Sequence, residues 1–86
     1  MLSKAKCLIT GITGMVGSHL ADFLLENTDW EIWGMYRWND NLDNIEHLLS
    51  RVNKKDRINL VNGDLNDLVS LMDVVDKSKP EFVFHL

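Results

Sequence analysis

Three glycines, Gly11, Gly14 and Gly17, stand between a short apolar run and an amphipathic segment. The run from Ala5 to Thr10 is typical of a strand that is buried on both faces. The apolar residues of the next segment, which extends from Met15 to Glu26, recur at helical spacing: Val16, Leu20, Phe23 and Leu24. A strand that turns into a helix across a Gly-rich loop is compatible with few folds, and the rest of the chain selects among them.

Strand and helix patterns continue to alternate. Further strands are predicted over Trp30–Tyr36, over Arg57–Asn62 and from Phe82 onward, and a helix over Leu42–Arg51. A last helix is expected to begin at a cap formed by Asn66 or Asp67 and to bury Leu68, Leu71, Met72 and Val75.

The order β-α-β-α-β-α-β indicates an α/β fold: a Rossmann-type three-layer sandwich with a parallel sheet. We expect residues 1–86 to form the N-terminal part of a single such domain. In the strand order 3-2-1-4-5-6 of this fold, the strand at Phe82–Phe84 would be buried on both faces.

The loop itself reads Gly11-Ile12-Thr13-Gly14-Met15-Val16-Gly17, a G-x-x-G-x-x-G variant of the dinucleotide fingerprint. The first glycine permits a tight turn, the second lets backbone N–H groups approach a pyrophosphate, and the third lets the helix pack against the strand. The positive end of the helix dipole favours the same anion. The sequence therefore predicts nucleotide binding at residues 11–17, with a purely structural turn as the alternative.

The residue that contacts the adenosine ribose is expected about 20 residues beyond the fingerprint. Counting from Gly17 gives Arg37, which cannot accept a hydrogen bond from a ribose hydroxyl but can bind a 2'-phosphate. This favours NADP as the cofactor. Two alternatives stay open: Arg37 lies on a solvated loop, or Asp40 or Asp43 binds the ribose of NAD.

The turn Gly63-Asp64-Leu65 follows the third predicted strand, at the sheet edge where open α/β folds bind ligands. Asp64 could accept from an adenine amino group while Leu65 covers the ring, or Asp64 could cap the next helix. Trp38, next to Arg37, is either a strand-end residue or a border of the adenosine pocket.

Charge and composition exclude several classes of function. A net charge of −4 and a pI of about 5.1 argue against a nucleic-acid partner. No apolar stretch approaches the roughly 18 residues of a membrane span, and the first ten residues lack the apolar run of a signal peptide. The single cysteine, Cys7, fits a buried position and a cytoplasmic location. His19, His47 and His85 share no metal-ligand spacing, so we expect no metal site.

The chain resembles the extended short-chain dehydrogenase/reductase family, also called NAD-dependent epimerase/dehydratases, and within it the GDP-mannose 4,6-dehydratases. The residues that carry the resemblance lie at 8–14, 17–21, 34–38, 43–48, 63–65 and 84–86. Family members commonly have basic or serine residues after the Arg-Trp pair, where this chain has Asn39, Asp40 and Asn41.

The resemblance assigns residues 11–16 to the cofactor pyrophosphate, Arg37 to the adenosine phosphate, Asp64 and Leu65 to adenine, and Leu86 to the turn beside the nicotinamide ribose. It also implies a nucleotide-sugar substrate and a homo-oligomer. The family's catalytic Tyr-x-x-x-Lys pair is expected beyond position 86, because the only tyrosine, Tyr36, is followed four residues later by Asp40. A nucleotide-sugar epimerase or reductase, or a non-catalytic NAD(P)-binding regulator, remains the alternative.

Overall fold

The computed structural model describes residues 5–53 and 57–86. Four strands form one parallel sheet in the order β3-β2-β1-β4. The strands are β1 (Lys6–Thr10), β2 (Glu31–Tyr36), β3 (Ile58–Asn62) and β4 (Phe82–His85). The helices are α1 (Met15–Asn27), a 3₁₀ helix η1 (Asp43–Leu48), α2 (Leu49–Asn53) and α3 (Leu68–Ser78). This is the predicted α/β architecture, with the 3-2-1-4 strand order of a Rossmann-type sheet.

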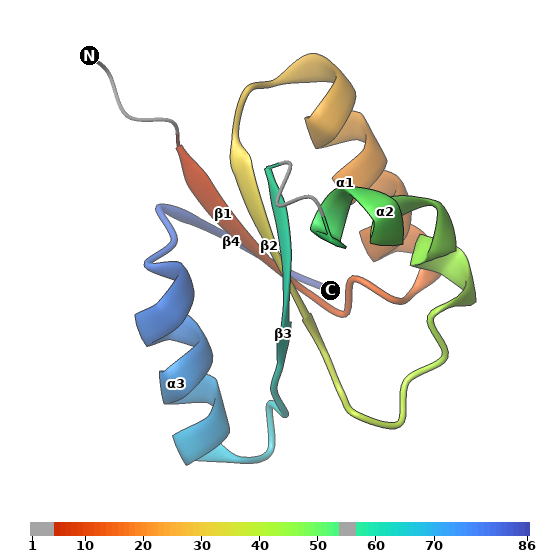
Figure 1. Cartoon of the computed structure of the whole chain (residues 1–86). Coiled ribbons are helices and arrows are strands. Elements are labelled where there is room, and N and C mark those ends of the chain that lie inside the picture. Colours follow the sequence, from red (N-terminus) through yellow and green to blue (C-terminus); the bar gives the residue numbers. More distant parts are fainter. Residues whose placement is uncertain (1–4, 54–56) are drawn as a thin grey trace.

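The elements form three layers (Figure 1). The helix α1 lies with η1 and α2 on one face of the sheet, and α3 covers the opposite face. Thr10 is paired with Met35 on one side and with His85 on the other, and Tyr36 is paired with Asn62. The carboxyl ends of the four strands are therefore aligned at one edge, and the loops that leave this edge lie close together.

The core of the α1 face is apolar and includes Cys7, Ile9, Ile32 and Ile58, all of them fully buried. The buried cysteine is the structural residue that the sequence predicted. Helix α1 contributes Gly17, Ser18, Ala21, Leu24 and Leu25 to its buried face. The predicted face was partly wrong, since Val16 and Phe23 are exposed.

The close approach of Gly17 to the strand end explains this difference. A Cβ at Gly17 would collide with the carbonyl oxygen of Gly11 and lie 3.0 Å from the Cα of Ile12. Because this contact turns the Gly17 side of α1 toward the sheet, the residues one and two helical turns on, Ala21 and Leu24, are buried, and Val16 is directed away from the sheet. The third glycine thus has the packing role that the fingerprint predicted.

The predicted helix over 42–51 is instead two short elements, η1 and α2. In a 3₁₀ helix, residues i and i+3 lie above one another. Ile45 and Leu48 have this separation, and both are buried in the core of the α1 face. The tighter 3₁₀ helix therefore directs the side chains of Ile45 and Leu48 into the same core.

Strand β3 begins at Ile58 rather than at the predicted Arg57, because Arg57 has a left-handed backbone (φ 62°). Its guanidinium donates to the carbonyl oxygens of Leu25 and Thr28 at 2.7 Å and of Trp30 at 3.3 Å. Arg57 thus satisfies carbonyl groups at the C-terminal end of α1 and in the loop to β2, a position that also favours a positive charge.

The other face of the sheet is covered less completely. Helix α3 is capped by Asp67, which accepts from the backbone N–H groups of Val69 and Ser70, and it buries Val74 and Ser78. The apolar face predicted for this helix was mostly wrong: Leu71 is half-buried, but the others are exposed, namely Leu68, Met72 and Val75. Phe82 and Val83 of β4 are exposed as well, on a strand that is paired on one side only. The burial expected for this strand refers to a sheet in which a fifth strand lies beside it, and it stays a prediction.

Candidate functional site

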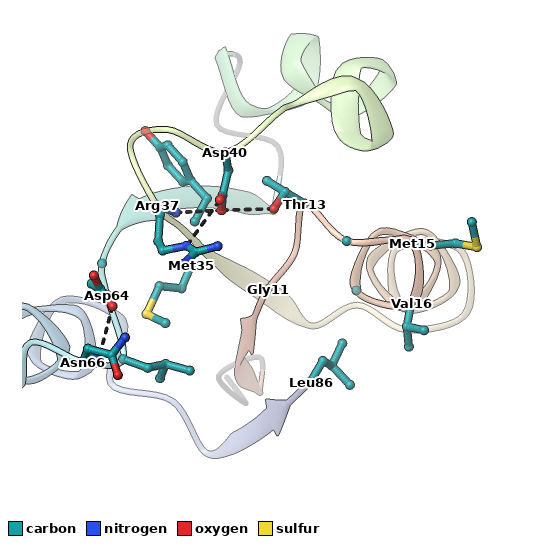
Figure 2. A pocket seen from close by; sticks show the side chains of 15 residues that line it. Gly11, Thr13, Met15, Val16, Met35, Arg37, Asp40, Asp64, Asn66 and Leu86 are labelled. Carbon is teal, nitrogen blue, oxygen red and sulfur yellow. Dashed lines mark hydrogen bonds and ion pairs between the residues drawn. The ribbon is translucent and has the colours of Figure 1, made fainter.

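A cleft of about 740 Å³ lies at the carboxyl edge of the sheet (Figure 2). It is lined by Gly11, Thr13, Gly14, Met15, Val16, Gly17, Met35, Tyr36, Arg37, Asp40, Gly63, Asp64, Leu65, Asn66 and Leu86. These residues come from the loops after β1, β2 and β3, from the carboxyl end of β2, from the first turn of α1 and from the residue after β4. The structure therefore brings together all the binding residues predicted from the sequence except Ile12.

Ile12 points away from the cleft. It is fully buried in the core, and a Cβ at Gly34 would lie within 3.0 Å of three atoms of its side chain. Its side chain packs in the core and so holds the Gly-rich loop against the sheet. Only the backbone of Ile12 could contact a ligand in the cleft.

The Gly-rich loop forms a tight turn before α1. Gly11 has φ +70°, a left-handed conformation that favours glycine. The backbone N–H of Gly14 donates to the carbonyl of Gly11 at 3.0 Å, and Gly14 is the N-cap of α1. No side chain caps this end of the helix, and its first turn contains no acidic residue. The backbone N–H groups at the start of α1 are thus available to an anion in the cleft.

Arg37 and Asp40 form the end of the cleft beyond β2 (Figure 2). The backbone N–H of Arg37 donates to Asp40 Oδ2 at 2.8 Å, and Nε of Arg37 lies 3.4 Å from Oδ1. The hydroxyl of Thr13, in the Gly-rich loop, also donates to Oδ2, at 3.2 Å. One carboxylate therefore joins the loop after β2 to the loop after β1.

Hydrogen bonding lowers the pKa of Asp40 below its usual value, and the backbone N–H of Arg37 makes the largest contribution. The carboxylate is therefore charged at neutral pH. Asp43, the other acid considered for an NAD ribose, is exposed and is not among the residues that line the cleft.

A second contact fixes the same loop. The side-chain amide of Asn44 donates to the backbone carbonyl of Thr13 at 3.0 Å. Thr13 thus contacts the segment after β2 through both its hydroxyl and its carbonyl group.

Asp64 and Leu65 lie at the other side of the cleft, before α3. Asp64 Oδ1 accepts from the backbone N–H of Asn66 at 2.9 Å, while Ser70 Oγ accepts from the backbone N–H of Asp64 at 2.9 Å. The N-cap of α3 is Asp67, so the capping role considered for Asp64 belongs to the residue three positions later. Leu65 is exposed at the cleft.

Leu86 is held at the cleft by Thr10. The backbone N–H of Leu86 donates to Thr10 Oγ1 at 3.2 Å, and the same oxygen lies 3.1 Å from Nδ1 of His85. Thr10 is buried at the end of the central strand. Its hydroxyl connects the carboxyl ends of β1 and β4 and positions the backbone that follows β4.

The sequence did not identify Met35, Tyr36 and Asn66 as lining residues, and it offered Asp40 only as an alternative for an NAD ribose and Gly63 only as part of the Gly63-Asp64-Leu65 turn. Each lies at or just after the carboxyl end of a predicted strand, and this position is the feature of the sequence that could have identified it as a lining residue. Gly63 has a clear steric reason, because a Cβ there would lie 2.7 Å from Val74 and 2.9 Å from Sδ of Met35. Trp38 is 83% exposed and does not line the cleft.

Two features are absent from residues 5–53 and 57–86. We find no group of three or more His, Cys, Asp or Glu side chains that could hold a metal ion. We also find no helix with the length and apolarity that crossing a membrane would require.

A parallel sheet in the order 3-2-1-4, with a G-x-x-G-x-x-G loop at the edge where its crossovers diverge, is the architecture of a Rossmann-type nucleotide-binding domain. Comparison with known families agrees and is more specific. The model of the family described as GDP-mannose 4,6 dehydratase matches residues 8–86. The chain belongs to this family.

Individual proteins show the same relationship. GDP-mannose 4,6 dehydratase of Drosophila melanogaster is 41% identical over 83 residues, which cover 92% of this chain and 21% of the fly protein. The solved structure of the PbgP3 protein from Burkholderia pseudomallei is 28% identical, with a TM-score of 0.74, over 98% of this chain and 23% of that one.

UDP-glucuronic acid 4-epimerase from Bacillus cereus, solved in complex with NAD, is 27% identical, with a TM-score of 0.69, over 94% of this chain and 26% of that one. The chain thus spans about a fifth of the length of the curated relatives that it matches.

Proposed function

We propose that this chain is the cofactor-binding part of a nucleotide-sugar dehydratase that uses a nicotinamide dinucleotide and converts GDP-mannose to GDP-4-keto-6-deoxymannose. The observation that carries the proposal is the family match over residues 8–86, together with a cleft lined by the Gly-rich loop of that match. The likeness to an NAD-bound epimerase supports the cofactor class.

The geometry of the cleft supports a specific arrangement of the cofactor. The pyrophosphate would lie at the uncapped N-terminus of α1, against the backbone of residues 11–17. The adenosine would lie between the loops after β2 and β3, with Arg37 near its ribose and with Asp64 and Leu65 near the adenine. The nicotinamide half would then extend toward Leu86, on the far side of β1.

Arg37 favours NADP in this arrangement, because its guanidinium can bind a 2'-phosphate with charge-assisted hydrogen bonds. A nicotinamide dinucleotide held by the Gly-rich loop and Arg37 would supply reversible hydride transfer, which the proposed conversion requires because the sugar is oxidised at C4 and reduced at C6, with loss of water across C5 and C6. The residues of this chain bind and orient the dinucleotide. The base and acid groups are proposed to lie beyond position 86, and the full-length protein to be a cytoplasmic homo-oligomer.

The test is turnover by the full-length protein. With GDP-mannose and either NADP or NAD, we expect a product that has lost one water molecule and carries a carbonyl group at C4, detected by mass spectrometry and NMR. Isomerisation of a nucleotide sugar without loss of water would identify an epimerase instead. Tight dinucleotide binding without turnover of any nucleotide sugar would identify a non-catalytic regulator.

A further inference from the structure

Asp40 lies between the two loops that form the adenosine end of the proposed site (Figure 2). Its Oδ2 accepts from Arg37 and Thr13, and its Oδ1 is close to Nε of Arg37. The Asp40 side chain is 16% exposed, whereas that of Arg37 is 61% exposed. The carboxylate is therefore fixed in the wall of the cleft, and the guanidinium beside it remains largely in solvent.

This arrangement places a competitor next to the group that would bind a phosphate. A guanidinium uses the same planar set of N–H donors for carboxylates and for phosphates. A 2'-phosphate that reached Arg37 would have to share the guanidinium with Asp40 and would meet a like charge. A ribose without that phosphate carries no charge to repel, and its hydroxyl can donate to a carboxylate.

We propose that Asp40 is a specificity-determining residue that opposes the 2'-phosphate, so that this protein binds NAD and NADP with affinities within about tenfold of each other. The inference rests on the proposed function only in that the cleft must bind a nicotinamide dinucleotide. It goes beyond that function by naming the residue that sets the ratio of the two affinities.

The variant Asp40→Asn separates the charge from the loop structure. Both loop hydrogen bonds end on Oδ2, so an amide oxygen at that position would retain them. The amide nitrogen would replace Oδ1 and could not pair with Nε of Arg37. In the full-length protein we expect NADP to bind at least about fivefold more tightly and NAD affinity to change less than about threefold. Titration calorimetry with each cofactor would measure both values.

Three further variants complete the design. Asp43→Asn removes the same charge from the same segment but from a residue outside the cleft lining, and we expect the affinity ratio to stay constant. Asp40→Asn should raise NADP affinity less in an Arg37→Ala background than in the wild-type protein, because without the guanidinium only the like-charge repulsion is left to relieve. Asp40→Ser, which also lacks the charge, should reproduce the gain if the Asn variant folds poorly.

The outcomes are distinct. An unchanged NADP to NAD ratio in folded Asp40→Asn and Asp40→Ser proteins, a gain that is equally large without Arg37, or a wild-type preference for either cofactor above about tenfold would overturn the role of Asp40. Failure of the wild-type protein to bind either dinucleotide would overturn the proposed function as well.

Discussion

Gly14 and Gly11 are joined by a backbone hydrogen bond of 3.0 Å, yet the side of Gly14 that a Cβ would occupy is open. A Cβ there would lie 3.4 Å from the carbonyl oxygen of Gly11, an ordinary contact, and the backbone of Gly14 is extended (φ −75°, ψ 169°). Gly14 is therefore required less by the fold than by whatever approaches the loop.

The first prediction follows from this open space. In the full-length protein, Gly14→Val would place a branched side chain where the pyrophosphate approaches, and we expect dinucleotide binding to be lost while the domain stays folded. Titration calorimetry, with thermal unfolding measured in parallel, would test both halves of the expectation. Unchanged affinity in a folded variant would mean that the loop is only a turn.

Gly17→Ala provides a contrast within the same loop. Its Cβ would collide with the backbone of Gly11, so the strand and helix would have to separate. We expect the free energy of unfolding to fall by about 1 to 3 kcal/mol, the usual range for an overpacked core. A Gly17→Ala protein as stable as wild type would contradict the packing described for α1.

The second prediction concerns Arg37. If its guanidinium binds a 2'-phosphate, Arg37→Ala should lose roughly tenfold in NADP affinity, the lower end of what a charge-assisted bond contributes, because Asp40 shares the group. NAD affinity should barely change. Parallel titrations would detect the difference, and equal losses for both cofactors would remove Arg37 from the site.

The third prediction uses the left-handed backbone of Arg57. Arg57→Ala removes the hydrogen bonds to the carbonyl groups of Leu25, Thr28 and Trp30 and keeps a Cβ at φ 62°, so we expect a loss of about 2 to 3 kcal/mol. Arg57→Gly removes the same bonds but relieves the backbone, and it should be less destabilised by about 1 kcal/mol. Denaturant unfolding would measure the stability of both variants. An Arg57→Ala protein more stable than Arg57→Gly would refute the backbone argument.

The fourth prediction concerns the 86-residue chain produced alone. It should bind dinucleotide weakly at best, show no dehydratase activity and self-associate. On the α3 face, exposed apolar side chains extend along α3 and to Val83 of the edge strand β4: Leu68, Val69, Met72, Val75 and Val83. A patch of this kind favours association. A monodisperse, cooperatively unfolding monomer in size-exclusion and melting experiments would contradict this.

A matched pair of substitutions locates the cause. Val69 is 77% exposed on α3, and Val69→Lys should increase the monomer fraction of the isolated chain. Phe23 is 59% exposed on α1, on the opposite face of the sheet, and Phe23→Lys should have a smaller effect. Equal effects of the two substitutions would show that association is not specific to the α3 face.

The elements whose signals are local could be predicted from the sequence. The turn at Gly11 needs a left-handed residue, the cap at Asp67 needs an acceptor before α3, and β1 is a continuous apolar run. For the same reason the Gly-rich loop was placed correctly at the cleft. These features depend on residues a few positions apart, which periodicity and turn chemistry describe.

Features that depend on distant contacts could not be predicted. Asp40 is fixed by Thr13, 27 positions earlier, and no local pattern shows which acid in the segment after β2 will make that contact. The burial of α3 depends on what packs against it rather than on its own spacing, so Met72 is exposed despite its helical period. The orientation of α1 was set by the backbone contact at Gly17, which apolar periodicity does not report.

The central position of β1 has a consequence for the order in which the chain can fold. Thr10 pairs with Met35 on one side, but its partner on the other side, His85, lies 75 residues along the chain. During synthesis, the β1-α1-β2 unit can form early, while one edge of the innermost strand has no partner until β4 has emerged from the ribosome. Pairing over such a separation is slow, because a long loop must close before any contact is gained. The strand that appears first thus gains its second neighbour only after β2 and β3 have been made, and for that interval its apolar edge is open to other chains.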